Sequence, residues 1–164
     1  MQSTLNKEKY ISALQYFISE CNNGKLGIVK LNKLFYYLDF ISYRDTGESV
    51  TGETYKRLPK GPFAECLEII IESAKKAELI DCKQDESEKY GKRNRFELIK
   101  RPELSVFSDY EKELLKKICA TFKEWSTDQM IAQTHTEAPW VFSVPNRAIS
   151  YKNSDDIEFF TLPA

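Results

Sequence analysis

The amino-acid sequence predicts a mainly α-helical α+β fold: a single compact domain (1–164) of about five helices with one short strand and a β-hairpin. Apolar residues recur at helical spacing in several segments, which is the main sign of amphipathic helices. Two short β-like runs flank a polar loop between residues 78 and 100, as in a hairpin. A length of 164 residues with 41% hydrophobic residues suits one domain with its own core.

The first two helices are predicted over residues 6–21 and 28–45. In the second helix the apolar residues fill two nearly opposite arcs, so we expect it to be central and packed from both sides. The alternative is that the second arc faces a partner protein. The first arc, which we expect to be buried, includes Leu34, Phe35, Leu38 and Ile41, and the second contains Tyr36, Phe40 and Tyr43.

A short strand is predicted near residues 50–58, followed by a rigid turn at Gly61 and Pro62. A third helix is expected over residues 62–77, because proline is well tolerated in the first turn of a helix. The outward face of this helix carries Glu65, Glu68 and Glu72.

The second half of the chain predicts the hairpin and two further helices. The runs 78–82 and 95–100 are its expected strands, and the polar residues between them predict a long, mobile tip. Capping boxes start helices that end near residues 122 and 134, and the rest of the chain is expected to be irregular or to contain short helices. These capping pairs are Ser108 with Glu111 and Ser126 with Gln129.

Charge and cysteine content exclude several classes of protein. The net charge of −1 argues against bulk affinity for nucleic acid or an anionic membrane. No run of about 18 apolar residues is present, so no membrane span is predicted. The four cysteines form no C-x-x-C pair and only one histidine accompanies them, which argues against a zinc site. We expect a reduced cytoplasmic protein without a cofactor.

His135 is the single candidate for a catalytic base or nucleophile partner. It follows a predicted helix end and precedes a tryptophan, a setting in which imidazoles usually cap carbonyls or pack. We therefore expect a structural His135. The sequence contains no glycine-rich phosphate-binding motif, and no carboxylate pair can be singled out as catalytic.

The order helix, turn, strand, helix and hairpin is similar to a winged helix, in which the helix before the wing enters the DNA major groove. The three glutamates of the third helix would oppose phosphates, so nucleic-acid binding is disfavoured. The hairpin tip has mixed charge: Lys89, Lys92, Arg93 and Arg95 lie beside Asp85, Glu86 and Glu88.

Three segments together resemble the Panacea, or SocA-like, antitoxin domain, which is related to the phage-associated GepA group. They are "KLNKLFYYLDFISYRDTGESVTGETYKRLPKGPF" (30–63), "ELI" (78–80) and "THTEAPW" (134–140). The resemblance spans roughly residues 8–145, and residues 146–164 form a C-terminal extension that we infer can carry partner specificity.

The resemblance implies a non-enzymatic antitoxin that binds and neutralises a toxin protein encoded beside it. Because such domains are paired with many unrelated toxins, neither the toxin nor the oligomeric state follows from the sequence. The alternatives are a nucleic-acid-binding regulator and, third, an enzyme using His135.

The partner-binding residues we expect are Tyr36, Tyr43, Tyr55, Arg57 and Lys60, of the types that dominate interfaces. Tyr55, Arg57 and Lys60 are expected to be at least partly exposed around an exposed strand edge. The alternative is a buried structural strand from which only the Lys and Arg side chains reach outward. The alternative for Arg57 is an internal pair with a carboxylate such as Asp39.

Overall fold

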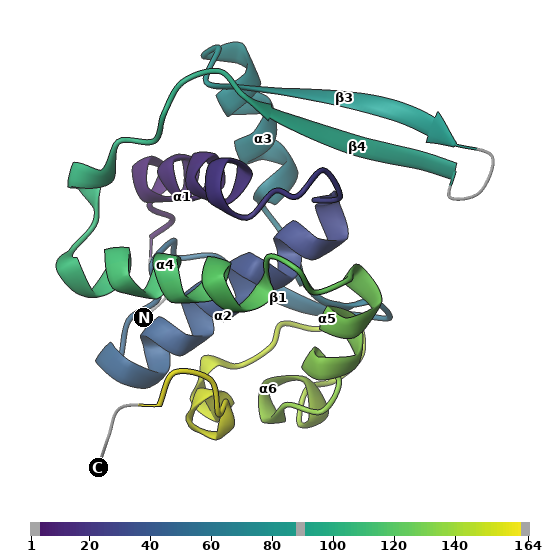
Figure 1. Ribbon diagram of the computed structural model, residues 1–164. Coiled ribbons are helices and arrows are strands. Elements are labelled where there is room, and N and C mark those ends of the chain that lie inside the picture. The colour runs from purple at the N-terminus through teal and green to yellow at the C-terminus, as the bar shows by residue number, and fades with distance from the viewer. Residues whose placement is uncertain (1–3, 88–90, 162–164) are drawn as a thin grey trace.

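The computed structural model describes the backbone of residues 4–87 and 91–161, and side chains within these ranges except those of residues 85–93. It confirms the predicted mainly helical α+β class (Figure 1). The helices are α1 (Lys7–Glu20), α2 (Ile28–Thr46), α3 (Leu67–Lys76), α4 (Asp109–Phe122), α5 (Thr127–Thr134) and α6 (Ala138–Val141), with 3₁₀ turns η1 (Leu104–Val106) and η2 (Tyr151–Asp156). The strands form two antiparallel hairpins, β1 (Tyr55–Leu58) with β2 (Gly61–Ala64) and β3 (Ile80–Ser87) with β4 (Gly91–Leu98).

The helix boundaries follow from caps that are visible in the sequence. The side chain of Asn6 accepts a hydrogen bond from the amide of Lys9 at the start of α1. Both predicted capping boxes are formed, at the starts of α4 and α5, and α2 ends at Gly47 with φ at +82°. Each of these caps satisfies backbone groups that a helix end leaves without an intrahelical partner.

Helix α2 is central and packed from both sides, as predicted. Every residue from Lys30 to Ser42 is buried, and the first apolar arc is fully buried at Leu34, Phe35, Leu38 and Ile41. Tyr36 and Phe40 are also fully buried. The alternative that the second arc faces a partner is therefore wrong for these two side chains.

The predicted start of the third helix at Pro62 is wrong, because residues 61–64 form the strand β2. Gly61 has φ at +108°, and the chain turns back there to pair with β1. Two side chains of α2 hold the outer edge of β2: Asn32 Oδ1 accepts from the Ala64 amide at 2.7 Å, and Lys33 Nζ donates to the Pro62 carbonyl at 3.1 Å. These long-range bonds stabilise an extended backbone where local preference favours a helix.

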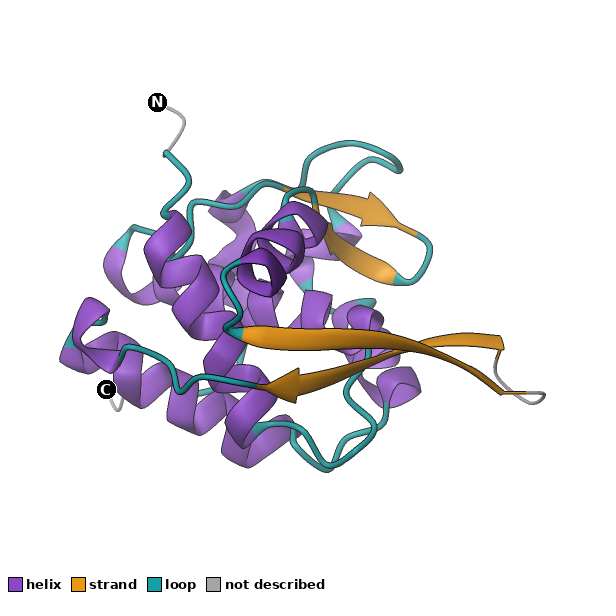
Figure 2. Cartoon of the chain, turned by 90° about the horizontal axis from the view of Figure 1, so that it is seen from above, coloured by secondary structure: helices purple, strands orange, loops and turns teal. Residues whose placement is uncertain are grey.

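The β3–β4 hairpin is confirmed, but its loop is shorter than predicted. Pairing runs from Ile80 opposite Leu98 to Ser87 opposite Gly91, so most of the expected mobile tip is strand. Lys89 and Glu88 lie outside the described residues, as do the side chains of Asp85, Glu86, Lys92 and Arg93. The outer half of this hairpin extends beyond the helices (Figure 2).

The C-terminal extension packs onto the domain. Ile149 donates its amide to the Tyr55 carbonyl at 2.7 Å, and Arg57 donates its amide to the Arg147 carbonyl at 3.0 Å. The outer edge of β1 is thus paired, and the prediction of an exposed edge is wrong. The guanidinium of Arg44 further donates to the carbonyls of Ile157, Phe159 and Phe160.

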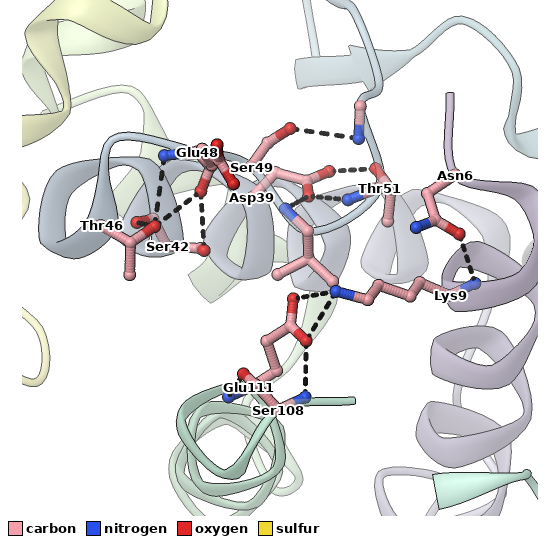
Figure 3. A network of polar contacts seen from close by, with 12 residues as sticks. Asn6, Lys9, Asp39, Ser42, Thr46, Glu48, Ser49, Thr51, Ser108 and Glu111 are labelled. Atoms are coloured by element: carbon pink, nitrogen blue, oxygen red, sulfur yellow. Dashed lines mark hydrogen bonds and ion pairs between the residues drawn. The ribbon is translucent and has the colours of Figure 1, made fainter. Parts of the chain in front are cut away.

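The turn between α2 and β1 is held by the buried carboxylate of Asp39 (Figure 3). Oδ1 accepts from the amides of Val50 and Thr51 at 2.9 and 2.8 Å. Oδ2 accepts from the Thr51 and Tyr55 hydroxyls, both at 2.6 Å. Burial raises the pKa of Asp39 to about 6 against these bonds, so the carboxylate is ionised at neutral pH.

We predict that Asp39→Ala lowers the free energy of unfolding by about 3–5 kcal/mol, because several buried donors lose their acceptor together. Urea unfolding measures this loss, with Asp155→Ala as the exposed control, for which a change within about 0.5 kcal/mol is expected. A similarly small change for Asp39→Ala would show that the turn holds its place without the carboxylate.

Candidate functional site

The structure does not bring the five predicted partner-binding residues to one surface. Tyr36 and Tyr55 are fully buried, so the expected exposure of Tyr55 is wrong. Tyr55 is buried because its hydroxyl binds Asp39 and its backbone lies between β2 and residues 146–149. Tyr43 is half-buried, with its ring centroid 5.2 Å from that of Tyr151. Arg57 is half-buried and Lys60 is exposed, so the expectation that these two side chains are at least partly exposed is confirmed.

Arg57 binds the loop that follows α6. Its Nη1 donates to the Ser143 carbonyl at 2.7 Å and to the Trp140 carbonyl at 3.3 Å. Its Cζ also lies 4.6 Å from the ring centroid of Trp140, within the range of a cation–π contact. The alternative of an internal pair with a carboxylate such as Asp39 is wrong, because the described partners of the Arg57 side chain are two carbonyls and an indole. The carboxylate of Asp39 is occupied by the turn.

Three exposed apolar side chains lie at the end of α6 and in the loop that Arg57 holds. Val141 is 51% exposed, Phe142 70% and Val144 61%. The sequence reasoning missed them, although the run "PWVFSV" at residues 139–144 is a signal of apolar residues in a short segment. We call Arg57, Lys60, Val141, Phe142 and Val144 the basic–apolar surface.

Lys33 lies buried below the turn between β1 and β2. Burial lowers the pKa of Lys33 to about 7, with a smaller contribution from the positive charge of Lys60. Gly61 has a positive φ, which favours glycine, and a Cβ there would lie 2.5 Å from Lys33 Cε, so Lys33 would have to shift. By contrast, the buried Lys30 donates to the carbonyls of Lys123 and Trp125, near the C-terminal end of α4, and has a clear structural role.

His135 is a packing residue, as predicted. Its ring stacks on Trp140 with centroids 4.4 Å apart and an interplanar angle of 17°. Nε2 is buried and has no hydrogen-bond partner in the described part of the chain. Burial lowers the pKa of His135, and the nearby charges of Lys33 and Arg57 lower it further, against a bond to the Pro59 backbone. The contacts described for the imidazole are thus a ring stack, two cationic side chains and a backbone group.

Glu137 explains why two tyrosines of α2 are buried. Its carboxylate accepts hydrogen bonds from the hydroxyls of Tyr36 and Tyr37, both at 3.0 Å, and from Gln133. Burial raises the pKa of Glu137 to about 7 despite these bonds. The contacts join α2 to the turn between α5 and α6, and so they position α6, which carries Val141 and leads into the loop of Phe142 and Val144.

The winged-helix alternative lacks support from α3 and its flanks. Glu65, Glu68 and Glu72 are exposed, as predicted, and would face any phosphate backbone that approached this helix. Of the basic residues expected at the hairpin tip, Arg95 is exposed, whereas Lys89 and the side chains of Lys92 and Arg93 lie outside the description.

A family model described as Antitoxin SocA-like, Panacea domain matches residues 31–141. The match covers more than half of the chain and lies within the resemblance predicted over residues 8–145. No curated protein and no solved structure matches the chain. Within residues 4–87 and 91–161, the helices are too short or too polar to span a bilayer, and the described side chains include no metal-binding cluster of His, Cys, Asp and Glu.

We predict that Lys33→Met stabilises the protein, and more at pH 6 than at pH 9. The folded pKa of about 7 lies below the ordinary value of 10.5, so between these values the unfolded chain binds more protons. Wild-type stability therefore rises with pH, whereas the Met variant lacks this dependence. The lost bond to the Pro62 carbonyl affects both pH values equally.

Urea unfolding at the two pH values checks this prediction. The gain from Lys33→Met should shrink by about 2–3 kcal/mol between pH 6 and pH 9. Lys116→Met, at an exposed position of α4, is the matched control and should show no such change. An equal gain at both pH values would mean that the pKa of Lys33 is not lowered by folding and that its side chain stays charged at both pH values.

Proposed function

The chain belongs to the Antitoxin SocA-like, Panacea domain family, and from this premise we propose that it neutralises a neighbour-encoded toxin by binding it directly. Family membership is the observation that carries the proposal. The family name gives an antitoxin role in general, and direct binding is the step that we add.

The basic–apolar surface supports binding as the mode of action. Adjacent exposed apolar side chains often mark protein–protein contact sites. Aromatic residues and arginine are also the types that contribute most at interfaces, and this surface has both in Phe142 and Arg57. The bonds from Arg57 to the Trp140 and Ser143 carbonyls hold the loop before any partner arrives, which reduces the entropy cost of binding.

The two alternatives receive less support from the same residues. A nucleic-acid-binding regulator would need a basic recognition helix, whereas α3 exposes Glu68 and Glu72. An enzyme using His135 would need an imidazole that can exchange protons with a substrate, whereas this ring stacks on Trp140 and its Nε2 is buried.

We predict that the adjacent gene inhibits growth when expressed alone and that co-expression of this chain restores growth. The two proteins should co-purify as a stable complex, because neutralisation depends on direct contact. Growth curves and affinity purification of a tagged chain measure the two effects.

Asp39→Ala is a useful control in this experiment, because a chain with a displaced turn should neutralise less well at the same expression level. If neither neighbouring gene is toxic, or if rescue occurs without a complex, the proposed mode of action is wrong.

A further inference from the structure

Positive charge gathers around the turn between β1 and β2 without a described carboxylate partner. Lys60 is exposed and makes no hydrogen bond or ion pair within the described residues. The positive charge of Lys60 lowers the pKa of Lys33. The positive charges of Lys33 and Arg57 lower the pKa of His135. Lys56, the neighbour of Arg57 on β1, forms an ion pair with Glu65 at 3.2 Å. Because successive strand residues point to opposite faces, the positive charge without a carboxylate partner lies on the Arg57 face of β1.

The charge is retained at a cost to stability. A buried ammonium with a depressed pKa destabilises the folded state at neutral pH. Lys33 has a single described hydrogen bond, to the Pro62 carbonyl, which does not neutralise it. Departures of this kind from the rules of a stable interior are common at functional sites.

Apolar surface adjoins the cations through a defined contact. Arg57 reaches the loop of Phe142 and Val144 through the Ser143 carbonyl. Its described hydrogen bonds use Nη1, and a guanidinium has five N–H donors in a planar fork that matches a carboxylate. The exposed side chains of Val141, Phe142 and Val144 thus flank, along the chain, the Trp140 and Ser143 carbonyls that Arg57 binds.

We propose that the basic–apolar surface recognises a segment of the partner protein in which a carboxylate lies next to an aliphatic or aromatic side chain. This inference rests on the proposed function and names the chemistry of the partner segment. The carboxylate binds at Arg57 and Lys60, and the apolar neighbour covers Phe142 and Val144. A nucleic acid fits less well, because a phosphate backbone leaves the three apolar side chains uncovered.

A phage-displayed library of random dodecapeptides, panned on the wild-type protein, tests the chemistry without knowledge of the toxin. Selected peptides should be enriched in Asp or Glu next to Leu, Ile, Phe or Trp. Synthetic copies should bind about tenfold more weakly to Lys60→Glu and to Phe142→Ser, since each removes one half of the site. Binding should also weaken with added salt.

Matched variants separate the surface from general effects. Lys116→Glu reverses an exposed charge on α4, and Ile69→Ser removes a side chain on α3 that is 67% exposed, close to the 70% of Phe142. Both should bind the peptides like the wild type, and thermal melts should show that all four variants fold.

Several outcomes would overturn the inference. They are selected peptides without acidic residues, equal loss of binding in the α3 and α4 variants, or duplex DNA that binds in a Lys60-dependent manner while no peptide is selected. If an acidic peptide is selected but no neighbour-encoded protein competes with it for binding to this chain, the toxin proposal is contradicted. The proposed chemistry of the surface would still hold. If the toxin complex forms unchanged with Lys60→Glu and Phe142→Ser, the inference about the surface is contradicted, and the toxin proposal would still hold.

Discussion

The carboxylate of Asp39 is the interaction on which the other contacts depend. It lies fully buried on α2, and four hydrogen bonds bring Val50, Thr51 and Tyr55 to it. Tyr55 begins β1, and β1 in turn pairs with β2 on one edge and with residues 146–149 on the other. Since Arg57 is two residues further along β1, its contact with the α6 loop also depends on where Asp39 holds the turn.

Helix α2 uses buried polar side chains to position later segments of the chain. Asn32 and Lys33 bind β2, Tyr36 and Tyr37 bind Glu137, and Asp39 binds the turn before β1. Such bonds are directional, and leaving one unmade in the interior costs free energy, so they specify which segment lies where. Among them Lys33 stands apart, because its charge lacks a described counter-charge and lies beneath the basic–apolar surface.

The basic–apolar surface crosses the limit of the family match. Arg57 and Lys60 lie within residues 31–141, whereas Phe142 and Val144 follow directly after them. The domain is also completed from outside the match: Tyr10 of α1 donates to Glu53 at 2.6 Å, and Tyr151 donates to the Glu53 carbonyl at 2.7 Å. The shared region therefore depends on both flanks for its core, while the C-terminal flank also supplies Phe142 and Val144 to the surface.

The sequence by itself determined the helices and the family, because both depend on local patterns. Helical spacing of apolar residues and the pairs Ser108 with Glu111 and Ser126 with Gln129 act within a few residues, so α1, α2, α4 and α5 were predicted nearly to their ends. The tertiary structure alone decided that residues 61–64 are a strand, that Tyr36 and Tyr55 are buried, and that Arg57 binds carbonyls near Trp140. Each of these depends on a partner about 15 to 100 residues away, such as Asp39 for Tyr55 and Glu137 for Tyr36, and a local pattern does not identify which distant group a polar side chain will meet.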